Sequence, residues 1–391
     1  MNTFIQELTH FYDQTDYNMR IGYEAKRLFQ NLSGLGNYSR NTINLLARYY
    51  PGNKYLLFTP RRSDLFAIPE EVETISPLSK FSKRFGTHWR IFEIAKIAKK
   101  NKVDLFHGLS HVLPFWLGSS GIPTVLTIHD VIYMRFPDFY KKIDIRLYKF
   151  HTKGGCRRAT RILAISHQTK EDLVHFFNID PEKIVVIHQS CDKRFYERVS
   201  DEQKEIVRQR FRLPEKFILS VGTIESRKNQ LAILKGVVEE KLAVPVVLLG
   251  KPTEYKQALD EFIVEAGIRS QLIFLHGTNM EELQAIYQMA EVMVYPSFFE
   301  GFGLPVLEAQ ASGCPVITSD ISSMPEAGGD GALYIDPHNS AEIGAAIRKV
   351  LMNEEIRKEL IRRGTENAAL FSEQIVAEKL MNLYQSLVRQ K

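Results

Sequence analysis

Two glutamates, two glycines and a proline stand close together in the stretch Phe299-Glu300-Gly301-Phe302-Gly303-Leu304-Pro305-Val306-Leu307-Glu308. An apolar run, 292–296, precedes this stretch and is typical of a buried strand, and the proline suits the first turn of a following helix. Bare backbone N–H groups and the positive end of a helix attract phosphate oxygens, whereas carboxylates bind hydroxyl groups. The pattern therefore indicates a site for a molecule with both phosphates and hydroxyls; an ordinary strand–loop–helix unit is the alternative.

Two adjacent cations, Arg227 and Lys228, follow another apolar run, 217–222, within the segment GTIESRKNQ. Cations just beyond a strand could neutralise a pyrophosphate that departs as a leaving group, because they stabilise the charge that develops on it. The basic start of an ordinary helix is the alternative interpretation. The segment is thus a second candidate for phosphate binding.

The first half of the chain contains two further candidates, each after a strand-like run. Gly34 and Gly36 would let the backbone approach a phosphate closely, although their segment matches neither G-x-G-x-x-G nor a P-loop, and a simple turn is the alternative. His129 ends the run 124–129 and could orient or deprotonate a hydroxyl, with a purely structural histidine as the alternative. The histidine spacing in the sequence does not indicate a metal site.

Strand-like apolar runs alternate with helical stretches from residue 19 onward. The expected strands are 19–23, 55–59, 103–107, 124–129 and 161–166 in the first half, and 217–222, 246–250, 272–276, 292–295 and 314–318 in the second. The expected helices are 38–49, 86–101, 168–177, 228–240, 254–266, 280–289, 304–312, 340–353 and 355–369. This alternation predicts an α/β fold of two doubly wound parallel sheets, in which ligands bind beyond the carboxyl ends of the strands. A cleft between two domains is therefore the expected site.

The length of 391 residues also favours two domains. We expect a polar appendage at 1–18, a first domain at 19–199, a charged helical linker at 200–212 and a second domain at 213–371. The last segment, 372–391, has an amphipathic pattern that predicts a final helix.

The composition is that of a water-soluble globular protein, with 44% hydrophobic and 25% charged residues. No segment reaches the roughly 18 uncharged apolar residues that a membrane span needs, and the N-terminus lacks the pattern of a secretory signal. The three cysteines, Cys156, Cys191 and Cys314, show neither C-x-x-C pairing nor metal-ligand spacing. We therefore expect buried thiols, a reducing compartment and a cytoplasmic location.

The net charge of +5 is unevenly distributed. Residues 1–200 contain 30 Lys and Arg against 19 Asp and Glu, whereas the rest of the chain is acidic. The densest basic part is 80–102, whose apolar positions partly follow helical spacing. Such a helix could bind anionic lipid at the inner face of a membrane; the alternative is a solvated basic face on a helix whose apolar residues face its own core. The basic residues lack a recognisable nucleic-acid-binding module, so no nucleic acid is expected as a partner.

Taken together, these motifs resemble the retaining GT-B glycosyltransferases of family 4, and the resemblance covers nearly all the chain from Met19 onward. Its most specific part is the E-x7-E pattern formed by Glu300 and Glu308. The glycine loop GLGNYS, the strand end IHD and the segment GTIESRKNQ stand before it in the family's order. The resemblance implies two Rossmann-like domains that face each other across a cleft, with the last helix crossing back to the first domain.

The resemblance also implies roles for individual residues. Glu300 would hold hydroxyls of the donor sugar, Glu308 would bind the donor ribose, and His129 would contact the transferred sugar. Lys228, with Arg227 beside it, would bind the donor diphosphate and stabilise its departure.

Backbone groups would complete the donor site that the resemblance implies. The residues concerned are Gly301, Phe302, Gly303 and Leu304 around the sugar and phosphates, and Gly34 and Gly36 near the diphosphate. Thr223 stands where many members of the family carry an arginine. Phosphate neutralisation would therefore rest more heavily on Lys228 and Arg227.

The activity that the resemblance implies is transfer of a hexose from a nucleotide diphosphate sugar to a glycan or lipid-linked acceptor in cell-surface polysaccharide biosynthesis, with retention of anomeric configuration. The region around IHD is most similar to bacterial mannosyltransferases, so GDP-mannose is the first candidate donor, and UDP-glucose and UDP-N-acetylglucosamine are alternatives. Neither a cofactor nor a divalent metal is expected. A nucleotide-sugar epimerase and a non-catalytic sugar-nucleotide-binding subunit are the other functions that we considered.

Overall fold

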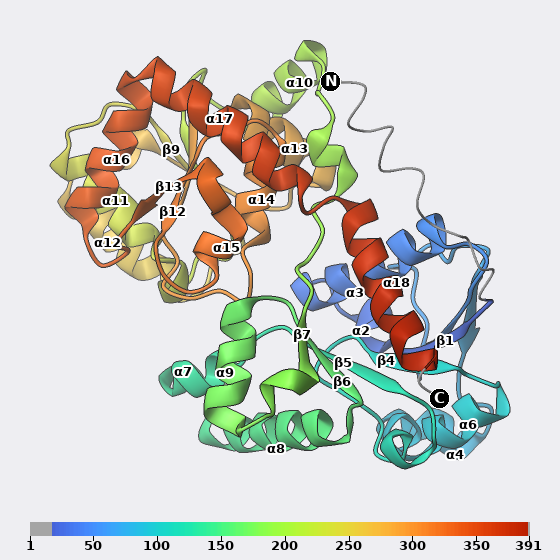
Figure 1. Ribbon diagram of the computed structural model, residues 1–391. Helices are drawn as coiled ribbons and strands as arrows, with labels where there is room; N and C mark the ends of the chain where they lie inside the picture. Colours follow the sequence, from blue (N-terminus) through green and yellow to red (C-terminus); the bar gives the residue numbers. More distant parts are fainter. Residues whose placement is uncertain (1–17, 390–391) are drawn as a thin grey trace. The chain divides into compact units, whose positions relative to one another are not determined.

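The computed structural model describes residues 18–389; residues 1–17, which form nearly all of the expected appendage, and residues 390–391 lie outside the described part (Figure 1). The chain divides into two units. The first unit extends to Leu126 and also includes Arg158–Thr160 and the chain from Leu383. The second unit consists of Thr127–Arg157 and Arg161–Asn382.

The first sheet has seven strands in the order β3-β2-β1-β4-β5-β6-β7. They are β1 (Arg20–Glu24), β2 (Lys54–Phe58), β3 (Val72–Ile75), β4 (Leu105–Gly108), β5 (Thr124–Ile128), β6 (Arg161–Ala164) and β7 (Ile184–Val186). β1 runs parallel to β2, with Ile21 opposite Tyr55. Every residue of β5 is buried, as in a strand that is covered on both faces.

The second sheet has six parallel strands in the order β10-β9-β8-β11-β12-β13. They are β8 (Ile218–Val221), β9 (Val246–Leu249), β10 (Leu272–Leu275), β11 (Val292–Tyr295), β12 (Val316–Ser319) and β13 (Ala332–Ile335). The strand order reverses between the neighbours β8 and β11. Connections from two such strands lead to opposite faces of the sheet and leave room for a ligand beyond their carboxyl ends. The two strongest motifs of the sequence follow these two strands.

Helices connect the strands of both sheets. In chain order they are α2 (Lys26–Gln30), α3 (Gly34–Tyr49), α4 (Lys80–Arg84), α5 (Gly86–His88), α6 (Ile94–Lys100), α7 (Ile132–Arg135), α8 (Lys142–Arg158), α9 (His167–Phe177), α10 (Asp201–Phe211), α11 (Gln230–Glu239), α12 (Lys256–Glu265), α13 (Met280–Met289), α14 (Leu304–Ala311), α15 (Met324–Gly328), α16 (Ser340–Met352), α17 (Glu354–Ala369) and α18 (Glu373–Arg389). The expected α/β fold with two doubly wound parallel sheets is confirmed.

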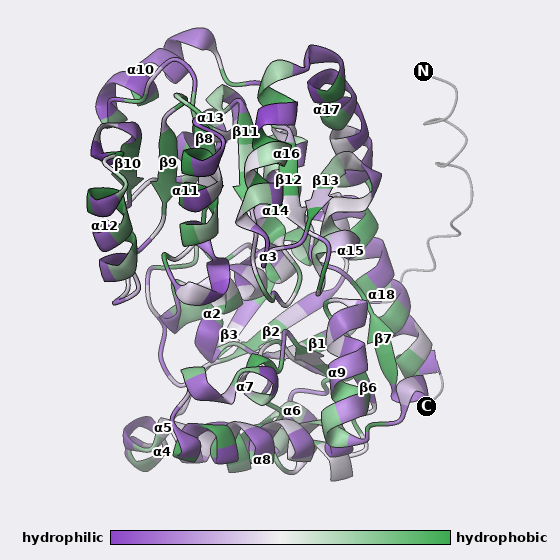
Figure 2. Ribbon diagram, turned by 90° about the vertical axis from the view of Figure 1, so that its left-hand side faces the viewer, coloured by the Kyte–Doolittle hydropathy of each residue, from purple (hydrophilic) through white to green (hydrophobic). Residues whose placement is uncertain are grey.

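The second sheet has helices on both faces. A cluster of buried apolar side chains joins its strands to α11, α12 and α16, with Ile233, Leu259 and Ile347 among its members. Figure 1 shows α13, α14 and α17 on the other side of this sheet. The strands between these layers are hydrophobic, as the green β9 and β11 of Figure 2 show.

Three strands were not expected from the sequence, namely β3, β7 and β13. Each lies at an edge of its sheet. β3 contains two polar residues and therefore forms no continuous apolar run, whereas β7 and β13 are short apolar runs that were not predicted as strands. In β3, Val72 is buried but Glu73 is exposed.

The expected helix 86–101 is interrupted by a π-helical turn at Trp89–Glu93, between α5 and α6. A π turn contains an extra residue and therefore shifts the following positions around the helix. Trp89 and Ile94 are buried, but Phe92 is 44% exposed. The alternative given for this segment, a helix whose apolar residues face its own core, therefore holds for Trp89 and Ile94 but not for Phe92.

All three cysteines, Cys156, Cys191 and Cys314, are buried thiols, as expected. Burial raises the pKa of the Cys191 and Cys314 thiols well above their usual range. Between residues 18 and 389, no helix has both the length and the apolar character needed to cross a membrane.

Candidate functional site

The neighbouring strands β8 and β11 bring the two strongest motifs into one network. The loop after β8 turns at Gly222, whose φ of +132° favours glycine, and continues into the short 3-10 helix Ser226–Lys228. The loop after β11 carries Glu300. As a result, Lys228 Nζ lies 2.5 Å from Glu300 Oε1. The structure thus brings together two residues that the sequence placed far apart.

Glu300 interacts with two cations through the same oxygen. Arg227 Nη1 lies 2.8 Å from Glu300 Oε1, and Arg227 Nη2 donates a hydrogen bond to Glu225 Oε1 at 2.6 Å. The Lys228 and Glu300 side chains are each only 11% exposed, so water screens these charges weakly. Removal of Glu300 would take away the carboxylate that both cations share, and Lys228 would lose the compensation of its buried charge.

This pairing determines the charge of Glu300. Burial alone would raise the pKa of the carboxyl group, but the positive charges of Lys228 and Arg227 and their hydrogen bonds outweigh burial and lower the pKa to about 2. Glu300 is therefore a carboxylate at neutral pH. In that form it can accept hydrogen bonds from hydroxyl groups but cannot donate a proton.

Tyr295 belongs to this network, although the sequence analysis did not identify it as a site residue. Its hydroxyl donates a hydrogen bond to Glu300 Oε1 at 3.1 Å and accepts one from Lys228 Nζ. Tyr295 is the last residue of β11. That position could have indicated a role, because residues at the carboxyl ends of parallel strands line such sites.

The loop that carries Glu300 orients two of its backbone N–H groups to the side away from Ser323. Ser323 Oγ donates hydrogen bonds to the carbonyl oxygens of Glu300 and Phe302 at 2.9 and 2.8 Å. In a trans peptide the N–H points away from the carbonyl group of the same unit, so the N–H groups of Gly301 and Gly303 point away from Ser323. Within the described part of the chain, neither N–H has a hydrogen-bond acceptor. Two such amides suit an anionic oxygen.

The second glycine of the motif is required by the fold. Gly303 has a φ of +121°, and a Cβ atom there would lie 2.6 Å from Met324 Cε. α14 begins at the next residue, Leu304, with Pro305 in its first turn as expected. The Phe302 side chain is buried and its ring is stacked on that of His188, with centroids 5.2 Å apart. A ligand of this loop would therefore meet the backbone of Phe302 and not its side chain.

His129 lies against the same loop. A Cβ atom at Gly301 would come within 2.6 Å of the His129 carbonyl oxygen, so glycine permits this close approach. The next residue, Asp130, has a pKa that burial raises, and Arg227 and Glu300 are among the charged groups that act on it. The structure thus brings the end of β5 next to the Glu300 loop. The contact of His129 with a transferred sugar stays a prediction.

Glu308 lies in a different environment, on α14. Tyr287 Oη donates a hydrogen bond to Glu308 Oε2 at 3.0 Å. Burial raises the pKa of Glu308 to about 7, although the hydrogen bond from Tyr287 acts in the opposite direction. The two glutamates of the motif therefore differ in charge at neutral pH.

The two glycines of the first half belong to the first unit. Gly34 begins α3, and open space surrounds the position of a Cβ atom there. Gly36 is buried, and a Cβ atom would lie 1.9 Å from the Asn31 carbonyl oxygen. Local packing therefore accounts for the glycine at 36, and the role of both residues near a diphosphate stays a prediction.

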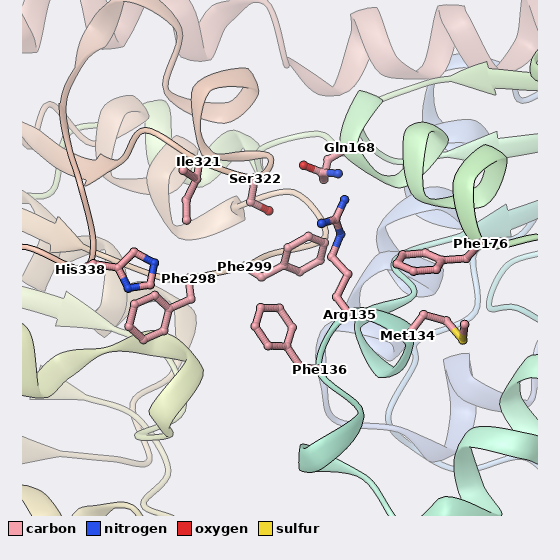
Figure 3. Close-up of a pocket in the computed structure, with 10 residues that line it drawn as sticks. All are labelled: Met134, Arg135, Phe136, Gln168, Phe176, Phe298, Phe299, Ile321, Ser322 and His338. Atoms are coloured by element: carbon pink, nitrogen blue, oxygen red, sulfur yellow. The ribbon is translucent and has the colours of Figure 1, made fainter.

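A pocket of about 730 Å³ borders the Glu300 loop (Figure 3). The residues that line it include Arg135, Phe136, Phe299 and Ser322. Phe299 immediately precedes Glu300 in the chain. The pocket was not predicted from the sequence, because its residues come from segments far apart in the chain.

One group of histidine and glutamate side chains has ligand atoms within 4.8 Å of one another, namely His167, His188 and Glu326. Glu326 accepts hydrogen bonds from the backbone N–H groups of His167 and Gln168, at 2.7 and 3.0 Å, and lies 3.1 Å from His188 Nε2. This carboxylate therefore has an evident structural role at the start of α9. The expectation that activity needs no divalent metal stays a prediction.

Two protein families match this chain, one in each half. Residues 32–194 match the family described as Glycosyltransferase Family 4, and residues 201–367 match the family described as Glycosyl transferases group 1. The first range contains His129. The second contains Lys228, Glu300 and Glu308.

Individual proteins are similar over most of the chain. The O-antigen chain mannosyltransferase B of Escherichia coli is 30% identical over 292 residues, which are 72% of this chain and 74% of that protein. The O-antigen chain mannosyltransferase RfbU of Salmonella typhimurium is 27% identical over 293 residues, which are 73% of this chain and 76% of that protein. Among solved structures, Anabaena HepE in complex with UDP and glucose has a TM-score of 0.72 at 16% identity, covering 94% of this chain and 100% of that chain. At this identity the structural likeness shows the fold.

Proposed function

The chain belongs to the glycosyltransferases of group 1 and family 4, with the GT-B fold, and on this premise we propose that it transfers mannose from GDP-mannose to a glycan or lipid-linked acceptor of a cell-surface polysaccharide. The two mannosyltransferases of O-antigen chains described above support mannose as the sugar. UDP-glucose and UDP-N-acetylglucosamine are the alternative donors. The complex of Anabaena HepE with UDP and glucose supports UDP-glucose as one of these alternatives.

The observation that carries this proposal is the network of Arg227, Lys228 and Glu300 beside the amides of Gly301 and Gly303. Two cations and two N–H groups suit a diphosphate. A carboxylate that stays ionised suits the hydroxyls of a hexose. A nucleotide diphosphate sugar carries both kinds of group in one molecule.

In the proposed reaction the bond between the sugar C1 and the diphosphate oxygen breaks, and its electron pair leaves with the nucleoside diphosphate. Lys228 and Arg227 stabilise the negative charge on the leaving group. The acceptor hydroxyl oxygen forms the new bond to C1 from the same face of the sugar, and its proton passes to the departing phosphate oxygen. The anomeric configuration is thereby retained without a nucleophilic side chain.

The remaining site residues take the roles that the family resemblance implies. Glu300 holds hydroxyls of the transferred sugar, His129 contacts that sugar, and Glu308 binds the ribose of the donor. The backbone of Phe302 and Leu304, together with Gly34 and Gly36, contributes to the binding of the donor.

A nucleotide-release assay tests the proposed donor. The purified protein is incubated with GDP-mannose, UDP-glucose or UDP-N-acetylglucosamine in separate reactions, and extracted lipid-linked glycans of the source organism serve as acceptors. We expect release of GDP from GDP-mannose with labelled mannose in the glycan. Release of UDP from one of the other two sugars instead would show that the donor is a UDP-sugar. A changed sugar without release of nucleotide would indicate an epimerase, and binding without any reaction would indicate a non-catalytic subunit.

Removal of divalent metal tests the proposed mechanism. If Lys228 and Arg227 supply the positive charge at the diphosphate, the rate of GDP release should change less than twofold after EDTA treatment. If EDTA abolishes activity and added Mg²⁺ or Mn²⁺ restores it, a divalent cation also neutralises the diphosphate.

We also propose that this protein is cytoplasmic and that the segment 80–102 contacts anionic lipid at the inner face of a membrane. Phe81 and Phe85 are 59% and 48% exposed within this basic segment. Apolar rings among basic side chains suit the interface of an anionic bilayer. Flotation with vesicles that contain phosphatidylglycerol should recover the protein at low salt, and vesicles of phosphatidylcholine should not. Absence of binding to the anionic vesicles at every salt concentration would refute this contact.

A further inference from the structure

Aromatic rings dominate the pocket beside the Glu300 loop. Its lining includes Phe136, Phe176, Phe298 and Phe299, together with His338 (Figure 3). The Phe136 and Phe299 rings lie 5.9 Å apart and are inclined by 60°. Phe298 is stacked on His338 with ring centroids 4.8 Å apart. The pocket therefore offers several broad apolar faces in different orientations.

One arginine lines the pocket, and its charge is already paired. Arg135 Nε donates hydrogen bonds to both carboxylate oxygens of Asp172, at 2.9 and 3.0 Å, and Arg135 Nη2 donates to one of them at 2.5 Å. The guanidinium carbon lies 5.3 Å from the Phe299 ring centroid and 5.8 Å from that of Phe176, and Figure 3 shows it between the two rings. A guanidinium held in this way presents oriented donors without an uncompensated charge.

The pocket adjoins the network around Glu300 but does not include its cations. Ser322 Oγ accepts a hydrogen bond from the Glu300 N–H and donates one to the Glu300 carbonyl oxygen, each at 3.2 Å. Arg227 donates a hydrogen bond to the carbonyl oxygen of Phe299. Among the described residues that line the pocket, neither Arg227 nor Lys228 is present. A ligand in the pocket would therefore lie beside the proposed site of the donor sugar and away from the cations proposed to hold the diphosphate.

We infer that this pocket binds the terminal sugar of the acceptor glycan, an inference that rests on the proposed function and adds the position of the acceptor. A pyranose ring has an apolar C–H face that packs on an aromatic ring and a rim of hydroxyls that hydrogen-bond to groups such as Arg135 and Gln168. The pocket volume of about 730 Å³ lies within the range of roughly 300–1,000 Å³ that is usual for small ligands. A nucleoside diphosphate suits the pocket less well, because a single guanidinium held by Asp172 lines it, whereas Arg227 and Lys228 lie together beside the amides of Gly301 and Gly303 in the adjoining network.

Binding of simple sugars without any donor tests this inference independently of turnover. Methyl α-glycosides of mannose, glucose and galactose are added in turn to the full chain, and saturation-transfer difference NMR measures their dissociation constants. We expect at least one glycoside to bind in the millimolar range. Phe136→Leu should raise its dissociation constant about fivefold to tenfold, because the aromatic face is lost, and Phe136→Tyr should retain the binding.

The matched control is Phe150→Leu, which changes an exposed phenylalanine of α8 outside the pocket and should leave sugar binding unchanged. If Phe136→Leu does not fold, Ile321→Trp provides a second variant, because Ile321 lines the pocket from a partly exposed position. The larger side chain should block the sugar without altering the stability of the fold. The dissociation constant of GDP should stay the same in all of these variants.

Three results would overturn the inference: no binding of any glycoside, unchanged binding in Phe136→Leu and Ile321→Trp, or a parallel loss of GDP affinity, which would assign the pocket to the nucleotide. Failure of the proposed function has a different signature. If GDP-mannose is not a donor but sugar binding depends on Phe136, the result supports the acceptor pocket and refutes the proposed donor.

Discussion

The two ends of the motif, at Glu300 and at Glu308, place the same type of side chain in opposite electrostatic conditions. At Glu300, the cations Lys228 and Arg227 lower the pKa to about 2 in spite of burial. At Glu308, burial raises the pKa to about 7 and the hydrogen-bond donor is the neutral hydroxyl of Tyr287. The difference comes from the loop after β8, which supplies both cations to one end of the motif. The motif provides two carboxylates, and the cations that follow the neighbouring strand keep only one of them, Glu300, permanently charged.

The largest effect is expected at the permanently charged end. Glu300→Gln keeps the shape of the side chain but removes the charge that orients Lys228, and Lys228→Ala removes the main cation for the leaving group. Each change should lower kcat by about 1,000-fold, because removal of one preorganised electrostatic group commonly costs roughly 100- to 1,000-fold. Rates of GDP release with saturating donor and acceptor measure this effect.

The control for these two variants is Glu355→Gln, which changes an exposed carboxylate on α17. It should have the rate of the unmodified protein. Circular dichroism and thermal unfolding should show that Glu300→Gln and Lys228→Ala are folded. A rate within tenfold of the unmodified protein in either variant would contradict the roles proposed for the network.

A smaller, pH-dependent effect is expected at the Glu308 end. The folded-state pKa of about 7 lies above the ordinary value of 4.5, so Glu308 takes up a proton as the pH falls through 7. If its carboxylate binds the ribose hydroxyls, the donor should bind about tenfold more weakly at pH 6 than at pH 8. In Glu308→Gln the affinity at pH 8 should be lower and nearly independent of pH. Titration calorimetry with the donor measures both, and a pH dependence that persists in the variant would place the titrating group elsewhere.

The smallest effects should come from the two tyrosines, which sharpen the comparison between the ends. Tyr295→Phe removes a hydroxyl that bonds to Lys228 and Glu300, and kcat should fall about threefold to tenfold without a change in pH profile. Tyr287→Phe removes the hydrogen bond that lowers the pKa of Glu308, so the midpoint of the pH dependence of donor affinity should move to higher pH. A shift of that midpoint in Tyr295→Phe would show that the two ends are not independent.

The sequence predicted the central strands of both sheets because each is a continuous apolar run that is buried on both faces. It did not predict β3, in which Glu73 and Thr74 interrupt the apolar pattern, or β7 and β13, which are apolar but only three and four residues long. The exposure of Phe92 could not be predicted either, because a π turn changes the helical phase and the periodicity of apolar residues contains no sign of the extra residue.

Site residues were predictable where a local pattern carried them. Glu300 and Lys228 stand a few residues after strand-like runs, and in the structure Lys228 Nζ lies 2.5 Å from Glu300 Oε1. Tyr295 belongs to the strand itself and looked like an ordinary core residue, although its hydroxyl contacts both of them. Phe136 and Phe299 form one wall of the pocket only after folding, because more than 160 positions separate them in the chain. A contact between residues so far apart in the chain depends on tertiary packing, and no local sequence pattern predicts it.

The burial of Cys156, Cys191 and Cys314 makes the native thiols poor targets for thiol-specific reagents. Burial also keeps the Cys191 and Cys314 thiols protonated, and the protonated form reacts slowly. A cysteine introduced at one exposed position of each unit would therefore react selectively with spin labels or fluorophores. Pairs of such labels would report the distance between the two units in the free protein and with donor bound, without prior removal of the native cysteines.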